Sequence, residues 1–555
     1  MVRVLKYKFN QDVVSEMQNN AFLKNWPVVY ILHNDKEAYI GETTNASYRM
    51  QQHLKDMKRK DLQDAHIISD DTFNKSATLH YESLLIEYMS ADDCFNHLQN
   101  KNNGQRHHYY NRNEYQNKFY ELWSELQKEG LAKHKIKEIQ NMDLFKYSPY
   151  KSLSEDQFNI ANEVLQDLAD SFQSNVDKTY MINGEAGTGK SVLAVYLMNM
   201  LNDLIVSDGN DLTDPILYEF YSNIASLSDF KVALVVPMAS LRKTLQKVFS
   251  KIPNLNASMV IGPSDVAKEF YDILIVDEAH RLRRRVNLTQ YKSFDDVNRK
   301  LGFNKQASEL DWILKQSRYQ IMFYDEAQTI KPTDIRLEEF FKLKKAKNTI
   351  WFPLTFQLRV KGGNEYLQLI KRLFIQPNAI CINQKYQPKD YDVRVFEDVE
   401  DMITNIKEKN EMFGLSRTVS GYSWKWVSKK DKHLMDIHIG KYHYKWNTEN
   451  IDWVNSKDSI HEIGCIHTIQ GYDLNYVGVI LGNELKYNTT LQEIEIDEKQ
   501  YYDIKGKNTA TKEELKQYII NIYTTLLSRG IMGTYIYACD PNLRAYLQAI
   551  FNVEK

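Results

Sequence analysis

A phosphate-binding loop limits what this chain can fold into more than any other sequence feature. Residues 184–191 read GEAGTGKS and fit the pattern G-x-x-x-x-G-K-[ST] without a mismatch. The apolar residues 179–183 before the loop predict a buried strand, and residues 192–198 after it predict a helix. In this order, glycine backbone N–H groups face phosphates at the N-terminus of a helix. We therefore expect the chain to bind ATP or another nucleoside triphosphate.

Two side chains of the loop have separate expected tasks. Lys190 would reach the β- and γ-phosphates, and the hydroxyl of Ser191 would hold Mg²⁺. The expected nucleotide contacts are Gly184, Glu185, Ala186, Gly187, Thr188, Gly189, Lys190 and Ser191.

Length and composition indicate a folded protein with several compact parts. The chain has 555 residues, of which 43% are hydrophobic and 26% charged, and about three or four units are expected at this length. The formal net charge of −2 gives no global sign of a nucleic-acid binder, so such binding must use local basic surfaces. The four cysteines show no paired spacing, and no stretch approaches 18 consecutive apolar residues. We expect a cytoplasmic protein without a membrane segment, zinc site or disulfide framework.

Composition and residue patterning divide the chain into an N-terminal α/β region (1–105), a helical connector (106–150) and a long remainder (151–555). In the remainder, apolar strand candidates alternate with helices, which predicts a parallel sheet with nucleotide at the carboxyl ends of its strands. The strand candidates are 232–236, 273–276, 320–324, 349–352 and 476–481.

An acidic pair follows one of these strand candidates, about ninety residues after the phosphate loop. Residues 273–280 read ILIVDEAH. We expect Asp277 to bind Mg²⁺, and Glu278 to orient or deprotonate the attacking water.

Taken together, these motifs resemble the superfamily-one helicases, and the Schlafen-like helicases in particular. That resemblance implies two RecA-like parallel-sheet lobes, 151–350 and 351–555. It implies Gln157 as the adenine contact, Gln328 as a sensor of the γ-phosphate, and Arg359 and Arg529 as arginines that contact the phosphates. The segments that carry it are LSEDQ (153–157), VVPMAS (235–240), YDEAQ (324–328), QLR (357–359), CIHTIQGYD (465–473) and YTTLLSRG (523–530).

Two further segments leave alternatives open. The aromatic run GYSWKW (421–426) suits base stacking or core packing. The basic cluster after the acidic pair, Arg281, Arg283, Arg284 and Arg285, suits contact with a phosphate backbone or a solvated helix face.

A second constellation lies near the N-terminus. Residues 28–32 and 38–43 predict a β-hairpin that places Tyr30 and Tyr39 on one surface. A helix from 46 to about 58 would present Arg49 and His53 on one face, and a second helix, 76–89, carries Glu82. These groups suit phosphodiester hydrolysis. Glu82 would hold a divalent cation, Arg49 would neutralise the transition state, and a tyrosine would position or activate the nucleophile.

This pattern resembles the GIY-YIG nuclease family over roughly the first hundred residues. Tyr39-Ile40-Gly41 matches directly and leads to Arg49 and His53, whereas Val28-Val29-Tyr30 replaces Gly-Ile-Tyr. The late asparagine of that family corresponds to Asn100, Asn102 or Asn103.

We therefore expect an NTP-driven helicase or translocase that supplies nucleic acid to, or gates, a nuclease using Mg²⁺ or Mn²⁺. DNA is favoured over RNA as the partner, and the oligomeric state leaves no mark in the sequence. The fusion resembles bacterial anti-phage nuclease–helicase proteins, which implies a role in defence. Two alternatives stay open: a repair enzyme with the same chemistry, and a nucleotide-gated sensor of DNA structure that does not cleave.

Overall fold

The computed structural model describes residues 2–18, 20, 23, 25–100, 109–206, 209, 215–224, 229–355, 360–380, 385, 386, 388–469 and 471–554. The chain forms two compact units. The first comprises Met1–Asn162, Val195–Asn199 and Lys251–Asn254, and the second comprises Glu163–Ala194, Met200–Ser250 and Leu255–Lys555. No helix within these described stretches is both long enough and apolar enough to cross a membrane.

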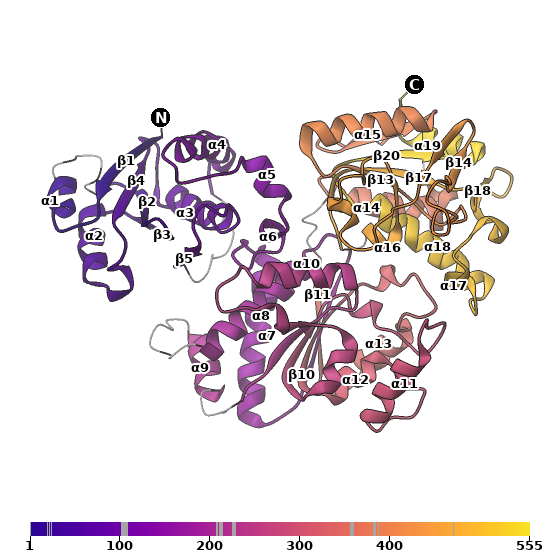
Figure 1. The fold of residues 1–555 in the computed structure, drawn as a ribbon, viewed down its shortest axis with the longest axis horizontal. Coiled ribbons are helices and arrows are strands. Elements are labelled where there is room, and N and C mark those ends of the chain that lie inside the picture. Colours follow the sequence, from indigo (N-terminus) through magenta and orange to yellow (C-terminus); the bar gives the residue numbers. More distant parts are fainter. Residues whose placement is uncertain are drawn as a thin grey trace. The chain divides into compact units, whose positions relative to one another are not determined.

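The first unit is built around one mixed sheet (Figure 1). Its strands stand in the order β1 (Arg3–Lys8), β4 (Asp64–Ser69), β2 (Val28–His33), β3 (Glu37–Thr43) and β5 (His97–Leu98). All neighbours are antiparallel except β3 and β5. The predicted hairpin is therefore confirmed as β2–β3, with Tyr30 opposite Gly41 and Leu32 opposite Tyr39.

Capping residues set where the two functional helices of this unit begin. Asn45 accepts a hydrogen bond from the backbone N–H of Tyr48 and starts α2 (Ala46–Lys55), and Asn74 does the same for α3 (Lys75–Met89) through the N–H of Ala77. The prediction that α2 runs to about residue 58 was wrong, because Asp56 adopts an extended conformation and caps a separate 3₁₀ turn. The other helices of the unit are α1 (Val13–Gln18), α4 (Arg112–Lys128), α5 (Ile136–Asn141) and α6 (Asp143–Lys146).

The predicted connector packs into the first unit. The ring of Tyr88 on α3 lies 5.6 Å from that of Trp123 on α4 and 4.8 Å from that of Phe145 on α6. Aromatic pairs at such separations add to the stabilisation from apolar burial. The region from 112 to 146 is therefore an ordered layer against α3.

The second unit contains two parallel six-stranded sheets, which confirms the expected α/β fold with two lobes. The first lobe has the order β11 (Thr349–Leu354), β6 (Thr179–Gly184), β10 (Ser317–Tyr324), β9 (Tyr271–Val276), β7 (Val232–Val235) and β8 (Val260–Ile261). The second lobe has the order β16 (Ile463–Cys465), β13 (Arg417–Ser420), β17 (Leu474–Leu481), β20 (Gly530–Ala538), β12 (Asp392–Phe396) and β21 (Asn552–Glu554).

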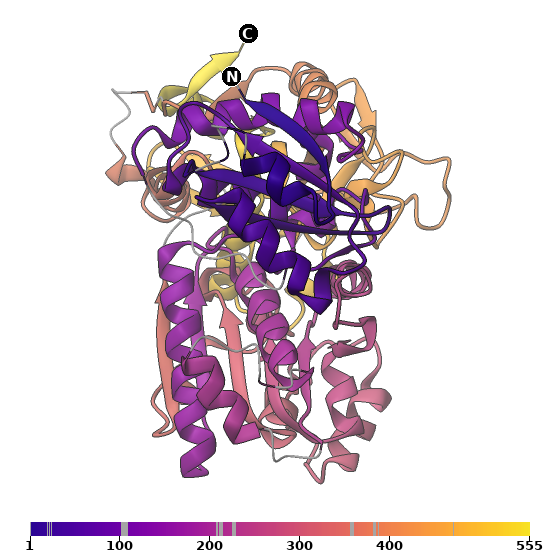
Figure 2. The same ribbon diagram turned by 90° about the vertical axis from the view of Figure 1, so that its left-hand side faces the viewer.

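Helices cover both faces of the first-lobe sheet, as the two views show (Figures 1 and 2). Those of the first lobe are α7 (Glu155–Ser174), α8 (Lys190–Val206), α9 (Pro215–Ile224), α10 (Ala239–Phe249), α11 (Tyr291–Lys300), α12 (Glu309–Lys315) and α13 (Leu337–Lys344). The second lobe carries α14 (Gly363–Ile375), α15 (Val399–Phe413), α16 (Ile466–Ile469), α17 (Ile504–Lys507), α18 (Lys512–Leu527) and α19 (Pro541–Ile550), with the hairpins β14–β15 (Ile437–Ile439, Tyr442–Tyr444) and β18–β19 (Leu485–Asn488, Glu493–Ile496).

Strand order brings the motor motifs together. The phosphate loop follows β6, the acidic pair follows β9, and Asp325 follows β10, which lies between those two strands. Because parallel neighbours end at the same edge of a sheet, these three loops converge there.

Candidate active sites

The phosphate loop has the backbone shape that its glycines permit. Gly187 and Gly189 have φ values of +89° and +79°, a region that side chains disfavour. A Cβ on Gly184 would lie 2.5 Å from the hydroxyl of Thr188 and 3.2 Å from Leu354. The loop therefore depends on glycine for both conformation and close packing.

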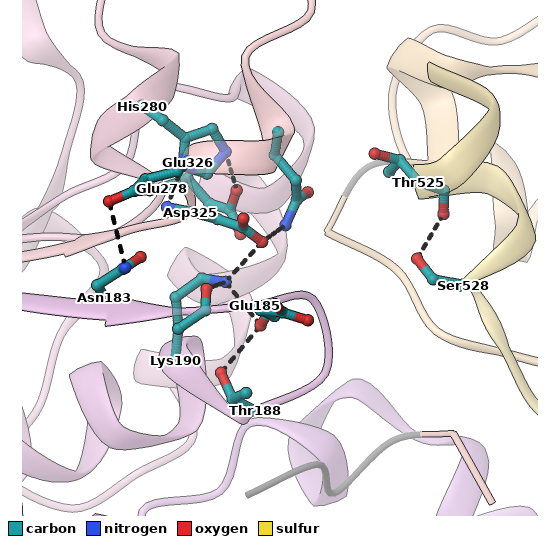
Figure 3. Close-up of polar contacts among 12 residues, drawn as sticks. Asn183, Glu185, Thr188, Lys190, Glu278, His280, Asp325, Glu326, Thr525 and Ser528 are labelled. Atoms are coloured by element: carbon teal, nitrogen blue, oxygen red, sulfur yellow. Dashed lines mark hydrogen bonds and ion pairs between the residues drawn. The ribbon is translucent and has the colours of Figure 1, made fainter. Parts of the chain in front are cut away.

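Lys190 is buried, and its ammonium group already makes three contacts (Figure 3). Nζ donates to the carbonyl oxygens of Gly184 at 2.7 Å and Glu185 at 3.1 Å, and lies 3.5 Å from Oδ2 of Asp325. The lysine is thus aimed into the loop, with a carboxylate close to its charge.

The two carboxylates after β9 have opposite electrostatic surroundings. Burial and the neighbouring Glu278 raise the pKa of Asp277 to about 7, although the Ser191 hydroxyl beside it acts in the other direction. Burial alone would raise the pKa of Glu278, but His280, Lys190 and Arg529 together bring it well below its usual range. Glu278 is therefore held as a carboxylate.

Sequence reasoning missed two residues that connect these loops. Nε2 of His280 lies 3.0 Å from Oε2 of Glu278, and the backbone N–H of Asp325 donates to Nδ1 of the same ring at 3.2 Å. A backbone donor at Nδ1 leaves the ring proton on Nε2, facing Glu278. The signal for Asp325 was present, since it follows strand candidate 320–324 as Asp277 follows 273–276.

A chain of contacts runs from the phosphate loop to the second lobe. Nε2 of Gln328 donates to Oδ2 of Asp325 at 2.6 Å, the oxygen that also contacts Lys190. Nη2 of Arg529 donates to Oε1 of Gln328 at 3.2 Å. Lys371 of α14 forms a second link between the lobes, with its Nζ 2.6 Å from Oε1 of Glu185.

Two other predicted motor residues are not brought into this cluster. Arg359 lies outside the described residues. Gln157 is buried in the first unit, where its Oε1 accepts the backbone N–H of Ser154 at 3.0 Å. Their roles stay predictions.

The arginines after the acidic pair form ion pairs and backbone hydrogen bonds within the first lobe. Arg281 pairs with Asp334 at 2.5 Å, Arg283 with Glu309 at 2.6 Å, and Arg285 with Asp295 at 2.5 Å. Arg284 donates to the backbone oxygens of Pro332 and Asp334. These ion pairs and hydrogen bonds hold the loop against the rest of the first lobe. The arginine charges are therefore already partnered within the protein.

The aromatic run at 421–426 packs against a buried tryptophan. Ring centroids of Tyr422, Trp424 and Trp426 lie 5.8, 6.3 and 5.9 Å from that of Trp446, which has no exposed surface. Core packing is therefore the role of Tyr422 and Trp424, whereas Trp426 packs on the same ring and stays half-buried.

In the first unit, Tyr30 is the centre of the predicted nuclease cluster. Its hydroxyl accepts a hydrogen bond from Nε of Arg49 at 3.2 Å and lies 2.8 Å from Nε2 of His53. A Cβ on Gly41 would overlap the Tyr30 hydroxyl, so the paired strand leaves space only for glycine. The ring of Tyr39 lies 6.2 Å from that of Tyr30 and 5.2 Å from that of His53.

Burial favours neutral forms throughout this cluster. It raises the pKa of Tyr30 and, with Arg49, lowers the pKa of His53 to about 4. Burial and the nearby Glu42 raise the pKa of Glu82 to about 7. Glu82 on α3 lies within electrostatic range of Tyr30 and Arg49. Across the described residues, no group of three or more His, Cys, Asp and Glu side chains is placed to hold a metal.

Asn100 binds the backbone of the Tyr39-Ile40-Gly41 strand. Its Oδ1 accepts from the N–H of Ile40 at 3.0 Å, and its Nδ2 donates to the oxygen of Ile40 at 2.8 Å. This position supports the strand, whereas Asn102 and Asn103 lie outside the described residues.

Similar proteins match about two thirds of this chain. The uncharacterized protein YPL245W of Saccharomyces cerevisiae is 28% identical over 400 residues, which cover 66% of this chain and 83% of that protein. A Pif1 helicase from Bacteroides, solved with ADP-AlF3 and ssDNA, is 12% identical and covers 67% of this chain and 91% of its own, with a TM-score of 0.27. The unliganded Pif1 from Bacteroides has a TM-score of 0.26, with the same identity and the same coverage of both chains. TM-scores this low support no conclusion about function.

Residues 177–540 match the family model of the Schlafen group 3 DNA/RNA helicase domain. This match spans both parallel sheets except for the terminal strand β21. The phosphate loop, the acidic pair, Gln328 and Arg529 all fall inside it. The chain belongs to the Schlafen group 3 DNA/RNA helicase domain family.

Proposed function

We propose that the second unit is an NTP-driven motor on nucleic acid and that the first unit is a metal-dependent endonuclease of the GIY-YIG kind. The observation that carries the motor proposal is the continuous line of contacts Lys190–Asp325–Gln328–Arg529 across the two lobes. Lys190 at one end belongs to the phosphate loop. Arg529 at the other end directly precedes β20 of the second lobe. Nucleotide arrival at the loop therefore has a direct physical route to lobe movement.

The phosphate contacts that we propose start from these side chains. Lys190 would exchange the Asp325 carboxylate for the β- and γ-phosphates. Asp325 and Gln328 would then rearrange, and Arg529 would neutralise charge on the transferring phosphoryl group. Glu278, already ionised, would accept a proton from the attacking water, while His280 holds it in place. Hydrolysis would thus depend on both lobes.

The motor site also suits a divalent cation. Oδ2 of Asp277 is buried and has no hydrogen-bond partner in the described part of the chain, and the Ser191 hydroxyl lies beside this carboxyl. A buried, unpaired carboxylate oxygen is costly unless a cation compensates it. Asp277 and Ser191 would hold Mg²⁺, which supplies charge stabilisation for phosphoryl transfer.

The motor proposal is tested by Lys190→Ala. NTP hydrolysis should fall on the order of 10²–10³-fold, since the variant has no positioned cation at the transferring phosphates. Lys178→Ala serves as a control, because Lys178 precedes the same strand but pairs with Asp167. Unchanged hydrolysis in Lys190→Ala would refute the site.

The nuclease proposal rests on the hydrogen bonds at Tyr30. Arginine can only donate, so the Tyr30 oxygen accepts from Arg49, and its own proton is available for Nε2 of His53 in the tautomer that carries its proton on Nδ1. Its pKa is lowered to about 4, so His53 is neutral and able to accept the hydrogen bond from Tyr30. A water attacking a phosphodiester would pass its proton to Tyr30 as Tyr30 passes its own to His53.

The carboxyl chemistry of this site fits a hard cation. Glu82 would hold Mg²⁺ or Mn²⁺, which would polarise the phosphate and stabilise the leaving oxygen. Because one carboxylate dominates the site, most ligands would be water and substrate oxygens, as is usual for Mg²⁺. Glu42, paired with Lys75, lies near enough to raise the pKa of Glu82.

For the biological role we propose anti-phage defence on DNA in the bacterial cytoplasm, which rests on the resemblance to anti-phage nuclease–helicase fusions. Plaque counts on cells that express wild type, Lys190→Ala or Glu82→Gln test it. Protection by the wild type alone supports defence. If no variant alters plaque counts but Glu82→Gln sensitises cells to DNA damage, repair is the better account. Binding of DNA without cleavage in Mg²⁺ or Mn²⁺ would favour the sensor.

A further inference from the structure

A lysine-rich segment of the second lobe, residues 425–445, carries a local excess of positive charge. It contains six lysines and two aspartates, in a chain whose formal net charge is −2. It lies between β13 and β16 and includes the β14–β15 hairpin. The lysines are Lys425, Lys429, Lys430, Lys432, Lys441 and Lys445, and all but Lys445 are exposed.

These lysines differ from the arginines after the acidic pair. Each of those arginines is bound by a carboxylate or by backbone oxygens. By contrast, none of the six lysines lies within ion-pair distance of a carboxylate belonging to any residue that the structure describes. The positive charge of the five exposed lysines therefore faces solvent without an ion-pair partner, which favours a polyanionic ligand.

The acidic residues of the segment do not offset this charge at the surface. Asp436 is buried and accepts the backbone N–H groups of Ser428 at 2.8 Å and Trp446 at 2.9 Å. Asp431 is the one exposed acid between residues 425 and 445, all of which the structure describes. The buried carboxylate of Asp436 thus holds the backbone of the segment in place, and five of the six lysines lie on its exposed surface.

The segment is a rigid platform. Ile437, Ile439 and Trp446 lie in the hydrophobic core of the lobe. Tyr444 donates to Glu400 at 2.5 Å and Tyr442 to Asp398 at 3.3 Å, which ties the hairpin to the start of α15. A fixed array of charges loses little conformational freedom when it binds an extended ligand.

Its position connects it to the motor. The backbone of Ile463 donates to Lys445 at 2.9 Å and accepts from Asn447 at 3.0 Å, so the end of the segment is bonded to β16. That strand leads directly into α16 and then Tyr472, whose hydroxyl lies 3.0 Å from both Ser240 and Thr244 on α10 of the first lobe. A ligand on the lysines would therefore act on a strand that leads to the lobe boundary.

Groups that can contact bases lie among the lysines. Nζ of Lys429 stands 3.6 Å over the ring of the half-buried Trp426, and Leu434 and Met435 are exposed, by 48% and 42%. Basic side chains interleaved with aromatic and apolar ones suit nucleic acid, in which phosphates alternate with flat bases.

We propose that residues 425–445 form a nucleic-acid-binding surface that contacts the phosphate backbone through Lys425, Lys429, Lys430, Lys432 and Lys441. This inference rests on the proposed motor function and names the part of the second lobe that holds its polymer. It replaces the arginine cluster at 281–285, which the fold uses internally, as the local basic surface that a chain of near-zero net charge requires.

The test is a salt titration of binding to a fluorescein-labelled thymidine oligonucleotide, with full-length protein. Changing the five lysines to Gln should weaken binding by about tenfold or more at moderate salt. It should also reduce the slope of log affinity against log salt by about 3.5, since each of the five single-strand phosphates that is no longer neutralised lowers it by roughly 0.7. Changing the same five to Arg should preserve both quantities, because the charge is retained.

A matched control has the same charge change on the first lobe. Lys292, Lys300, Lys305, Lys345 and Lys347 are all exposed there, and changing them to Gln should leave the slope near the wild-type value. NTP hydrolysis without oligonucleotide should be the same in every variant, because none of these lysines touches the phosphate loop. The Gln variant of the segment should lose only the stimulation by oligonucleotide.

Three results would overturn the inference. The first is a wild-type slope in the Gln variant of the segment, and the second is an equal loss of affinity in the first-lobe control. The third is competition by polyglutamate as effective as that by oligonucleotide at equal charge, which would indicate a general polyanion site. If the wild type itself neither binds oligonucleotide nor hydrolyses NTP faster with it, the motor proposal fails together with this one.

Discussion

In the first unit, burial favours neutral groups around Tyr30, whereas in the second unit ionised groups are held together by opposite charges. The pKa of His53 falls to about 4 and that of Glu82 rises to about 7, so neither charge is favoured there without a ligand. Around the phosphate loop, His280, Lys190 and Arg529 keep Glu278 ionised despite its burial. In the proposed mechanism the first site would gain its charge from an incoming cation, whereas Glu278 in the second is ionised before nucleotide arrives.

The two sites also differ in how far apart their residues lie along the chain. Tyr30, Arg49 and His53 come from one hairpin and the next helix. Lys190 and Arg529 come from different lobes, and Asp325 and Gln328 connect them. Damage at one centre should therefore leave the other intact, and the motor should be more sensitive to single changes that separate the lobes.

The largest expected effect is that of Arg529→Ala. Removal of a cation that stabilises the transferring phosphoryl group should lower the turnover of NTP by about 10³–10⁵-fold, with nucleotide binding much less affected. Arg394→Ala is the control, because Arg394 pairs with Asp392 and Glu554 in the same lobe. Steady-state hydrolysis and nucleotide binding measure both. A fall of less than tenfold would show that the lobes do not share one catalytic site.

Glu82→Gln should lower cleavage of nucleic acid by about 10²–10⁴-fold while NTP hydrolysis stays within about twofold. The reason is the removal of the carboxylate expected to hold the cation, on a helix that belongs to the first unit. Glu16→Gln, on the exposed side of α1, is the matched control. A parallel loss of hydrolysis would contradict the separation of the two centres.

Asn100→Ala should destabilise the first unit by about 1–3 kcal/mol, because two backbone groups of Ile40 lose their partner. The first unit should unfold at a lower temperature, while the unfolding temperature of the second unit is unchanged. Gln51→Ala, at an exposed position of α2, is the control. If both transitions move equally, the two units unfold as one.

Glu82→Gln should also change the dependence of stability on pH. Its folded pKa, raised to about 7 from 4.5, means that the folded state loses stability as pH rises through this range. With a chelator present, the free energy of unfolding of the variant should therefore rise relative to that of wild type as the pH increases from 4.5 to 7. The expected change is about 1–2 kcal/mol after allowing for solvent screening. Melting curves at several pH values measure it. A constant difference would contradict the assigned environment.

The smallest effect is expected for Lys371→Ala. Its ion pair with Glu185 joins the lobes but is partly exposed, and such pairs contribute about 0–1 kcal/mol. Turnover of NTP should change by no more than about twofold. A loss as large as that of Arg529→Ala would place Lys371 in the catalytic machinery.

Contiguous motifs made much of the second unit predictable. The glycine spacing around Lys190 and the apolar run before Asp277 located two strand ends, and the parallel sheet was expected from their alternation. His280 and Asp325 were not assigned roles, because their contacts depend on which strands are neighbours. The ion pairs of the arginines at 281–285 were not foreseen for the same reason, since their partners Asp334, Glu309 and Asp295 are distant in sequence or on other elements.

In the first unit, the sequence predicted the hairpin and both helices but not the burial of Tyr30. Alternation along a strand shows which side chains share a face, and it does not show which layer covers that face. The packing of Tyr88 against Trp123 and Phe145 was likewise unforeseen, because the polar composition of residues 106–150 indicated a connector.

The most direct test of two separate chemical centres in one chain measures NTP hydrolysis and nucleic-acid cleavage in the same reaction, for wild type and Glu82→Gln. We predict that the wild type does both with Mg²⁺ or Mn²⁺, and that Glu82→Gln hydrolyses NTP at the wild-type rate without cutting. Cleavage that persists in Glu82→Gln, or hydrolysis that disappears with it, would contradict this account.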